Sequence, residues 1–277
     1  MKCFFIFFFT SCAALKLFAQ YGENYRPDAV MKYSYAVSGT YINPYHPEKL
    51  THYTGSGFFV RVSQKIFFVT ARHVISGCRE KTGAKKNFPD TMNISLHGEN
   101  GVPVLPVIPI VVSSYRDSGV CPAIKYPDIA AVQVPDSFMN KIFITDALVE
   151  TEEPEISGPV TIAGFPSGKN TGQLPGPASS IDFTVYKILD SLNYINSERE
   201  LETDSTNYIL LTKQTAIDSS LKGYSGSPVF EFSKNSWHFR GILMGASIPG
   251  KYFVIVKQKY LKEILSREVH VTTNDSR

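Results

Sequence analysis

Cysteine is scarce in this chain, and no sequence pattern typical of a metal site occurs. Only four of the 277 residues are cysteines, and neither a Cys-x-x-Cys nor a His-x-x-x-His spacing is present. We therefore expect neither a metal nor another cofactor. Cys3 and Cys12 fall in an apolar N-terminal segment, which leaves Cys78 and Cys121 for the rest of the chain. An oxidising compartment would permit one disulfide between these two, and two free thiols are the alternative.

A strong excess of charge of one sign is also lacking. The sequence has 28 Lys and Arg against 25 Asp and Glu, and residues 1–19 include two of the lysines but no acidic residue. A nearly neutral surface gives no electrostatic reason to bind nucleic acid or acidic lipid. We therefore expect no nucleic-acid partner.

The apolar N-terminal segment is typical of an export signal. Lys2 precedes the run CFFIFFFTS, and a cleavage point follows Ala19. The run is shorter than the roughly 20 residues that span a bilayer. We expect residues 1–19 to be a cleaved signal peptide and the protein to be secreted or periplasmic. The alternative is a lipoprotein, because residues 9–12 loosely resemble a bacterial lipobox, and membrane attachment is expected only if Cys12 is lipidated.

Frequent turn residues favour short strands over long helices. Seventeen prolines and 19 glycines are spread along the chain. Apolar runs on both sides of Ser63-Gln64 predict a β-hairpin over residues 57–70. Further strands are expected at residues 92–96, 102–112, 129–134, 160–163, 181–189, 208–213, 228–232, 239–244 and 252–256. Residues 258–268 repeat apolar side chains at helical spacing and predict a terminal amphipathic helix. The sequence thus predicts an all-β protein of antiparallel strands with one C-terminal helix.

An acidic stretch that contains proline divides the strands into two sets. We expect this stretch, residues 150–158, to link a first β domain over residues 53–149 to a second domain with the helix over residues 159–268. Residues 20–52 are polar and rich in tyrosine, and we expect them to be a lead-in or a short prosegment. Residues 269–277 are expected to be a tail.

Three local patterns contain side chains suited to nucleophilic catalysis. His73 follows the apolar strand FFVTA, Asp128 precedes the strand IAAVQV, and Ser225 stands between glycines in GYSGSP. Glycines beside a serine allow a sharp turn and leave the hydroxyl accessible. The N–H groups of Gly223 and Ser225 could then point at one position, as in an oxyanion hole. Taken singly, the histidine is more often a surface or core residue, and the aspartate and the serine are ordinary turn residues.

In this chain order the three patterns resemble those of the chymotrypsin-fold serine peptidases, namely T-A-x-H, D-I-A-L and G-x-S-G-G/S-P. Two further segments, GSGFFV at residues 55–60 and VTIAGFPSG at residues 160–168, are similar to the bacterial HtrA-like and glutamyl-endopeptidase-like branch. The likeness covers roughly residues 53–268. No large region follows residue 268 in the sequence, so we expect no C-terminal PDZ domain, which many HtrA proteins have.

The resemblance implies two antiparallel six-stranded β-barrels with the catalytic cleft between them and a C-terminal helix. It implies a serine endopeptidase that cleaves protein or peptide substrates through an acyl-enzyme intermediate and needs no cofactor. Ser225 would be the nucleophile, His73 its general base, and Asp128 the group that orients the base. The N–H groups of Gly223 and Ser225 would form the oxyanion hole.

The chain departs from the family pattern beside the serine. Tyr224 stands where the digestive enzymes have an aspartate that pairs with a freshly cut N-terminus, and no Ile-Val-Gly-Gly-like segment occurs. We infer that activation does not use that ion pair. Arg72 before the histidine and Ser227 after the serine also depart from the pattern, but neither change removes a catalytic group.

The resemblance also gives a substrate pocket without an acidic residue. Its base would be Ser219 and Ser220, and its wall would be Met244, Gly245, Ala246 and Ser247. This lining argues against a preference for Lys or Arg and leaves room for an apolar or uncharged polar side chain. A preference for a carboxylate, bound by His238, is the alternative.

Two other functions compete with the peptidase. An α/β-hydrolase esterase would need Gly-x-Ser-x-Gly, but residue 227 is serine, and strands do not alternate with long helices. The more serious alternative is a catalytically inactive binding module on a protease fold, because the bulk of Tyr224 could distort the oxyanion loop.

Overall fold

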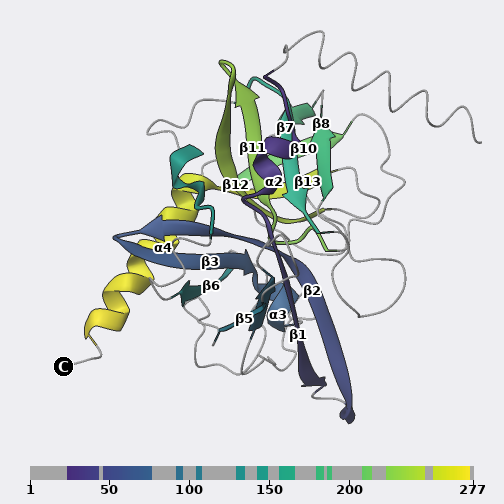
Figure 1. The fold of residues 1–277 in the computed structure, drawn as a ribbon, viewed down its shortest axis with the longest axis vertical. Coiled ribbons are helices and arrows are strands. Elements are labelled where there is room, and N and C mark those ends of the chain that lie inside the picture. Colours follow the sequence, from purple (N-terminus) through teal and green to yellow (C-terminus); the bar gives the residue numbers. More distant parts are fainter. Residues whose placement is uncertain are drawn as a thin grey trace, which may run out of the picture.

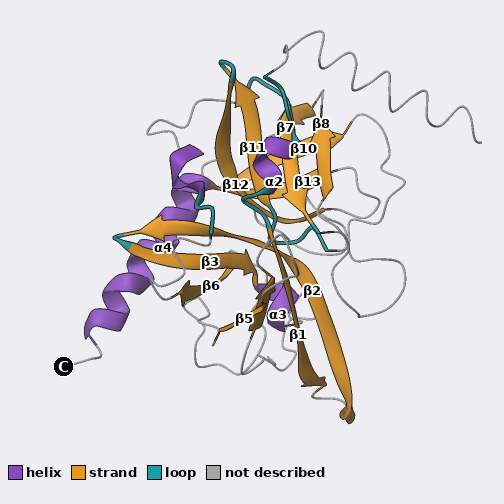
Figure 2. Cartoon of the chain, viewed as in Figure 1, coloured by secondary structure: helices purple, strands orange, loops and turns teal. Residues whose placement is uncertain are grey.

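Two antiparallel β-sheets and a C-terminal helix make up the part of the chain that the computed structural model describes (Figure 1). The described residues are 24–43, 46–76, 92–95, 104–107, 129–134, 142–148, 156–165, 179–183, 186–188, 208–213, 223–246 and 252–274. Figure 2 shows that strands dominate both halves. The prediction of a mostly antiparallel β protein with a terminal helix is confirmed.

The first sheet has six strands in the order β5-β4-β1-β2-β3-β6. Their bounds are β1 Tyr35–Asn43, β2 His46–Val62, β3 Lys65–Ala71, β4 Met92–Ser95, β5 Val104–Val107 and β6 Ile129–Val134. The predicted hairpin joins β2 to β3, and its two turn residues, Ser63 and Gln64, have φ angles of 48° and 68°. A type I′ turn, whose backbone twist matches that of the flanking strands, requires positive φ at both central residues.

The second sheet has seven strands in the order β8-β7-β11-β12-β13-β10-β9. Their bounds are β7 Val160–Gly164, β8 Ser179–Phe183, β9 Tyr186–Ile188, β10 Tyr208–Lys213, β11 Pro228–Ser233, β12 Ser236–Ala246 and β13 Tyr252–Lys257. The single strand predicted over residues 181–189 is two strands, β8 and β9, at opposite edges of this sheet. The described part of the second unit therefore contains one strand more than the predicted six.

In the described part of the chain, helices are few and mostly short. They are α2 Asp28–Met31, α3 Arg72–Ser76, the 3₁₀ turn η2 Thr145–Leu148, and α4 Gln258–Asn274. The predicted terminal helix is confirmed and is six residues longer than expected, and its Leu261 and Leu265 are fully buried. Within the described part of the chain, no helix is both long and apolar enough to cross a membrane.

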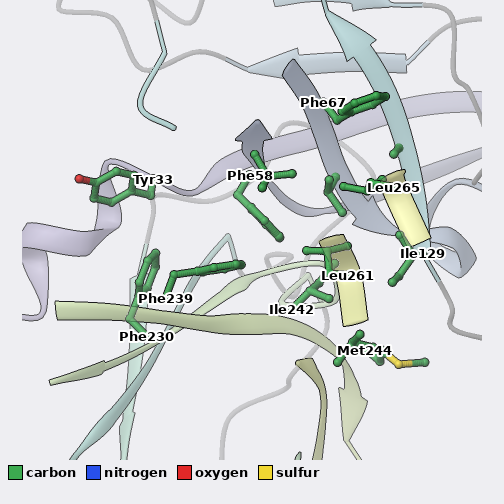
Figure 3. Close-up of a cluster of buried hydrophobic side chains, with 14 of the residues drawn as sticks. Tyr33, Phe58, Phe67, Ile129, Phe230, Phe239, Ile242, Met244, Leu261 and Leu265 are labelled. Carbon is green, nitrogen blue, oxygen red and sulfur yellow. The ribbon is translucent and has the colours of Figure 1, made fainter. Parts of the chain in front are cut away.

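One hydrophobic core joins the two sheets and α4. It takes Phe58 from β2, Phe230 from β11 and Leu261 from α4, as Figure 3 shows. Its other buried members are Val30, Tyr33, Val60, Val62, Phe67, Val69, Ile129, Ala131, Ala163, Phe239, Ile242, Met244, Val254, Val256 and Leu265. Each fully buried large apolar side chain contributes about 1.5–3 kcal/mol. The relative position of the two sheets is therefore fixed by side chains from both.

The predicted lead-in, residues 20–52, contains a central part of the first sheet. It includes β1, which lies between β4 and β2, and the first part of β2. Ahead of β1, the ring of Tyr25 packs 5.4 Å from the rings of both Phe232 and Trp237 of the second sheet. Burial raises the pKa of Tyr35 to about 12, so its hydroxyl stays protonated, and this oxygen accepts the N–H of Phe143.

We expect a chain that starts at Tyr53 not to fold. Such a chain lacks β1, so β2 loses its partner over residues 53–57, and the buried Tyr35 is missing. A chain that starts at Asn24 retains these contacts and is the matched control. Circular dichroism during heating would measure both, and a cooperative unfolding transition in the shorter chain would contradict the integral role of β1.

A buried ion pair fixes the start of the second sheet. Glu231 on β11 and Arg240 on β12 are 0% and 1% exposed, and the Arg240 Nε donates to the carboxylate at 2.7 Å. The other carboxylate oxygen accepts the N–H of Ser157 at 2.6 Å and that of Gly158 at 2.7 Å. These two residues end the predicted linker. The carboxylate therefore ties the linker to the sheet just before β7.

Replacing Glu231→Gln should lower the free energy of unfolding by about 3–5 kcal/mol, because the Arg240 guanidinium stays buried without a counter-charge. Chemical denaturation of the purified protein would measure the change. Arg26→Ala, which removes the exposed 2.8 Å pair of Arg26 with Asp28, is the control and should leave the midpoint unchanged. Equal midpoints for all three proteins would show that the buried pair does not stabilise the fold.

Candidate active site

The serine loop, residues 223–227, is held by its own backbone and by β12. The Ser227 N–H donates to the Tyr224 carbonyl at 2.9 Å, which closes a turn around Ser225. The Gly226 N–H donates to the Leu243 carbonyl, and the Leu243 N–H donates to the Ser227 carbonyl, both at 2.9 Å. A bulge in the pairing of β12 with β13 between Leu243 and Gly245 marks this place. Bulges commonly occur next to active sites, where they redirect the backbone.

Glycine is required at two positions of the serine loop. Gly223 and Gly226 have φ angles of 92° and 87°, which other residues rarely adopt. Between them, Ser225 is only 8% exposed. The expectation of a sharp, glycine-dependent turn at this serine agrees with the observed backbone.

The Tyr224 side chain lies inside the second sheet's own core. It is 5% exposed and belongs to a buried cluster with Val160, Ile162, Val229, Leu243, Phe253 and Ile255. The absent side chain of Gly164 gives the ring room, because a Cβ there would lie 2.7 Å from Tyr224 Cδ1. The bulk of Tyr224 is therefore accommodated in this core and anchors the loop there.

The serine loop rests directly on the strand that leads to His73. The Ser56 N–H on β2 donates to the Ser225 carbonyl at 3.0 Å. A Cβ added to Gly226 would lie 2.8 Å from the backbone nitrogen of Ala71, the last residue of β3. His73, which is partly exposed, follows two residues later on α3.

Gly55 marks a second place where the same segments meet. A Cβ added to Gly55 would lie 2.6 Å from Cγ1 of Val74 and 3.3 Å from the Ser225 carbonyl oxygen. Val74, the residue after His73, and Ser225, the predicted nucleophile, therefore both lie close to the backbone of Gly55. The structure therefore places the His73 segment and Ser225 on neighbouring segments of the chain.

Asp128 lies outside the described residues. The next residue, Ile129, begins β6 and pairs with Ala71, so β6 starts beside the end of the strand that precedes His73. Ser219, Ser220 and Ser247 of the predicted pocket, and both Cys78 and Cys121, also lie outside the described residues.

The described pocket candidates lie at one end of β12. The Met244 side chain is in the core shared by the two sheets, Gly245 is partly exposed, and Ala246 ends the strand. His238 lies six residues before Met244 on the same strand, and at about 3.3 Å per residue this separates the two by about 20 Å. His238 instead contacts the Ser233 carbonyl at 3.0 Å in the β11–β12 hairpin. The alternative in which His238 binds a substrate carboxylate stays a prediction, because Ser219, Ser220 and Ser247 lie outside the described residues.

Ser56 has no role in the sequence-based prediction, although the Gly55-Ser56-Gly57 motif was among the segments that carried the resemblance. In the structure, the side chain and the backbone of Ser56 form hydrogen bonds with three separate segments. The partners are Gly223, Phe165 and Thr70, in addition to Ser225.

No group of three His, Cys, Asp or Glu side chains that could hold a metal occurs among the residues that the structure describes.

Gly226→Ala should remove activity of the site and lower stability. The required φ alone costs roughly 1–3 kcal/mol for alanine, and the new methyl would meet the Ser56 carbonyl and lie 2.5 Å from Thr70 Oγ1. Thermal unfolding and reaction with an active-site probe would measure the two effects. Ser227→Ala, one residue further on, changes no backbone conformation and is the control. A Gly226→Ala protein as stable as this control would contradict the close seating of the loop.

Comparisons with known proteins bear on the fold and the family of this chain. A crystal structure of a thermostable serine protease, AL20, from an extremophilic microorganism matches with a TM-score of 0.51 at 12% identity, over 88% of this chain and 98% of that chain. At this identity the likeness shows the fold alone. A search of curated proteins gives no match. The family model described as the trypsin-like peptidase domain matches residues 55–242, well over half of the sequence, and the chain therefore belongs to the trypsin-like peptidase family.

Proposed function

We propose that the protein is a serine endopeptidase that uses His73, Asp128 and Ser225 as its catalytic triad. The observation that carries the proposal is the seating of the serine loop on the backbone that leads into His73, through Ser56 and Gly226. Membership of the trypsin-like peptidase family supports the same reaction class. Protein or peptide chains are the proposed substrates, and the reaction needs no cofactor.

In the proposed mechanism, the Ser225 hydroxyl attacks the carbonyl carbon of the scissile amide while His73 accepts its proton. The tetrahedral intermediate has a negative oxygen, which the N–H groups of Gly223 and Ser225 stabilise. One such donor is worth about 3 kcal/mol. The C–N bond then breaks, His73 protonates the leaving amine, and an acyl-enzyme remains. Water, activated by the same histidine, releases the acid and restores the hydroxyl.

Asp128 acts on His73 in this scheme. A carboxylate bonded to the imidazole holds the correct tautomer and stabilises the imidazolium that forms during attack. The start of β6 at Ile129, opposite Ala71, supports this assignment because it brings the chain near the end of β3.

Oxyanion stabilisation by Ser225 is supported by the direction of its peptide unit. In a trans peptide the carbonyl and the N–H point in opposite directions. The Tyr224 carbonyl is bonded to the Ser227 N–H inside the turn. The N–H of Ser225, on the same peptide unit, therefore points away from the turn.

Several finer assignments complete the proposal. The pocket formed by Ser219, Ser220 and residues 244–247 accepts an apolar or uncharged polar side chain, because none of these residues is acidic. Each sheet closes into a barrel, with the site in the cleft between the two. The chain belongs to the HtrA-like or glutamyl-endopeptidase-like branch, and it is exported after loss of residues 1–19, with a lipid anchor at Cys12 as the alternative.

A fluorophosphonate probe tests the triad, because it reacts only with a serine whose hydroxyl is activated. We expect the purified protein without residues 1–19 to be labelled, and Ser225→Ala to lose all labelling. His73→Ala and Asp128→Asn should lower peptide hydrolysis by several orders of magnitude with unchanged thermal unfolding. A folded wild-type protein that the probe does not label would favour the inactive binding module instead.

A further inference from the structure

The hydroxyl of Ser56 lies at the junction of three segments. The side chain is fully buried on β2. Its Oγ donates to the Gly223 carbonyl at 2.7 Å and accepts the N–H of Phe165, just after β7, at 2.8 Å. Its backbone carbonyl accepts the Thr70 hydroxyl at 2.7 Å. One serine thus connects the first sheet, the end of β7 and the first residue of the serine loop.

The bond to Gly223 acts on the peptide unit next to the proposed oxyanion donor. The Gly223 carbonyl belongs to the unit that joins residues 223 and 224, whereas its N–H belongs to the preceding unit. At a glycine with φ of 92°, rotation about either backbone bond meets little steric resistance, so the two units can turn relative to each other. Fixing the carbonyl therefore removes one of the motions that would turn the N–H away from the substrate.

Backbone hydrogen bonds hold the units of the loop that follow Tyr224. The Tyr224 carbonyl is held by the Ser227 N–H, the Ser225 carbonyl by the Ser56 N–H, and the Gly226 N–H by Leu243. The unit that contains the Gly223 carbonyl is the one that a side-chain hydroxyl holds. The Ser56 hydroxyl therefore holds a peptide unit of the loop that these backbone bonds do not hold.

We propose that Ser56 is a positioning residue: its hydroxyl fixes the peptide unit beside the Gly223 N–H and keeps the oxyanion hole assembled. The inference rests on the proposed peptidase function. Ser56 does not touch the reacting atoms, and it acts through the loop. Its effect belongs to the transition state, because the negative oxygen that Gly223 stabilises exists only after attack.

The neighbouring serine shows that the assignment is specific to residue 56. Ser227 is equally buried, and its Oγ has no hydrogen-bond partner among the described residues. Both hydroxyls lie against Gly164, where an added Cβ would be 3.0 Å from Ser56 Oγ and would also meet Ser227 Oγ. The two serines thus share a site and a degree of burial, but only Ser56 is bonded to the loop.

Ser56→Ala tests the proposal by removing one oxygen atom. For hydrolysis of a peptide amide we expect kcat to fall about 10- to 100-fold, the range expected when a catalytic group is misplaced by about 1 Å. KM should change less than about twofold, because the lost restraint acts on the transition state and not on substrate binding. Ser56→Cys, which has a similar shape and a weaker donor, should give an intermediate kcat.

Two controls separate positioning from a general loss of stability. Ser227→Ala removes the unbonded hydroxyl from the same site and should retain wild-type kcat. Thr145→Val removes a buried hydroxyl that donates to the Phe59 carbonyl at 3.1 Å, elsewhere along β2. It should lower the unfolding temperature as Ser56→Ala does while leaving kcat unchanged. An unchanged kcat in Ser56→Ala, or an equal fall in Thr145→Val, would overturn the proposal.

Hydrogen exchange gives a readout that needs no activity. In Ser56→Ala the amides of residues 223–227 should exchange faster than in wild type, and in Ser227→Ala and Thr145→Val they should not. If the wild type is not labelled by the probe, the peptidase function fails, and the exchange rates still decide whether Ser56 restrains the loop. If the wild type is active and loop exchange in Ser56→Ala is unchanged, the inference fails and the peptidase remains.

Discussion

The hydrogen bond from the Ser56 N–H to the Ser225 carbonyl is the contact on which the rest of the site depends. It joins a strand of the first sheet to a loop of the second, across a large separation in sequence. Nothing in the local sequence of either segment would otherwise bring Ser225 near His73. The side chains that could react are thus positioned by backbone groups, which are strong and directional hydrogen-bonding groups in every residue.

This contact is possible because the sheets share one core. Phe58 of β2, only two residues beyond Ser56, packs with Phe239 of β12 at a ring distance of 5.1 Å. Further along β12, Leu243 bonds to the serine loop on both its N–H and its carbonyl. The same two strands therefore supply the apolar contacts that hold the sheets together and the polar contacts that hold the loop. Burial of large side chains fixes the distance between the strands, and the hydrogen bonds then fix the direction of each peptide unit.

The sequence predicted those features that depend on local pattern. The strand over 129–134 and the hairpin at Ser63 agree with the structure because alternation and turn chemistry act over a few neighbouring residues. The segment over residues 181–189 was predicted as one strand, since an apolar run does not show which partner each half pairs with. β1 was missed because tyrosine, serine and threonine make it polar in composition, whereas Tyr35 and Val37 are buried. The role of the Ser56 side chain was also missed, because its partners, Phe165 and Gly223, lie far along the chain.

The way the serine loop is anchored also bears on how the site comes into being. In the digestive enzymes that the motif resembles, an aspartate at the position of Tyr224 pairs with a new N-terminus, so the loop waits for a cut in the chain. Here the corresponding side chain is an aromatic ring in the core, and its burial is worth about 1.5–3 kcal/mol. The Ser56 hydroxyl adds a neutral hydrogen bond of about 0.5–1.5 kcal/mol. Neither anchor requires a buried charge, with its large desolvation cost, or a free amino group. Both anchors are part of the packed sheets, and neither of them depends on a cut in the chain.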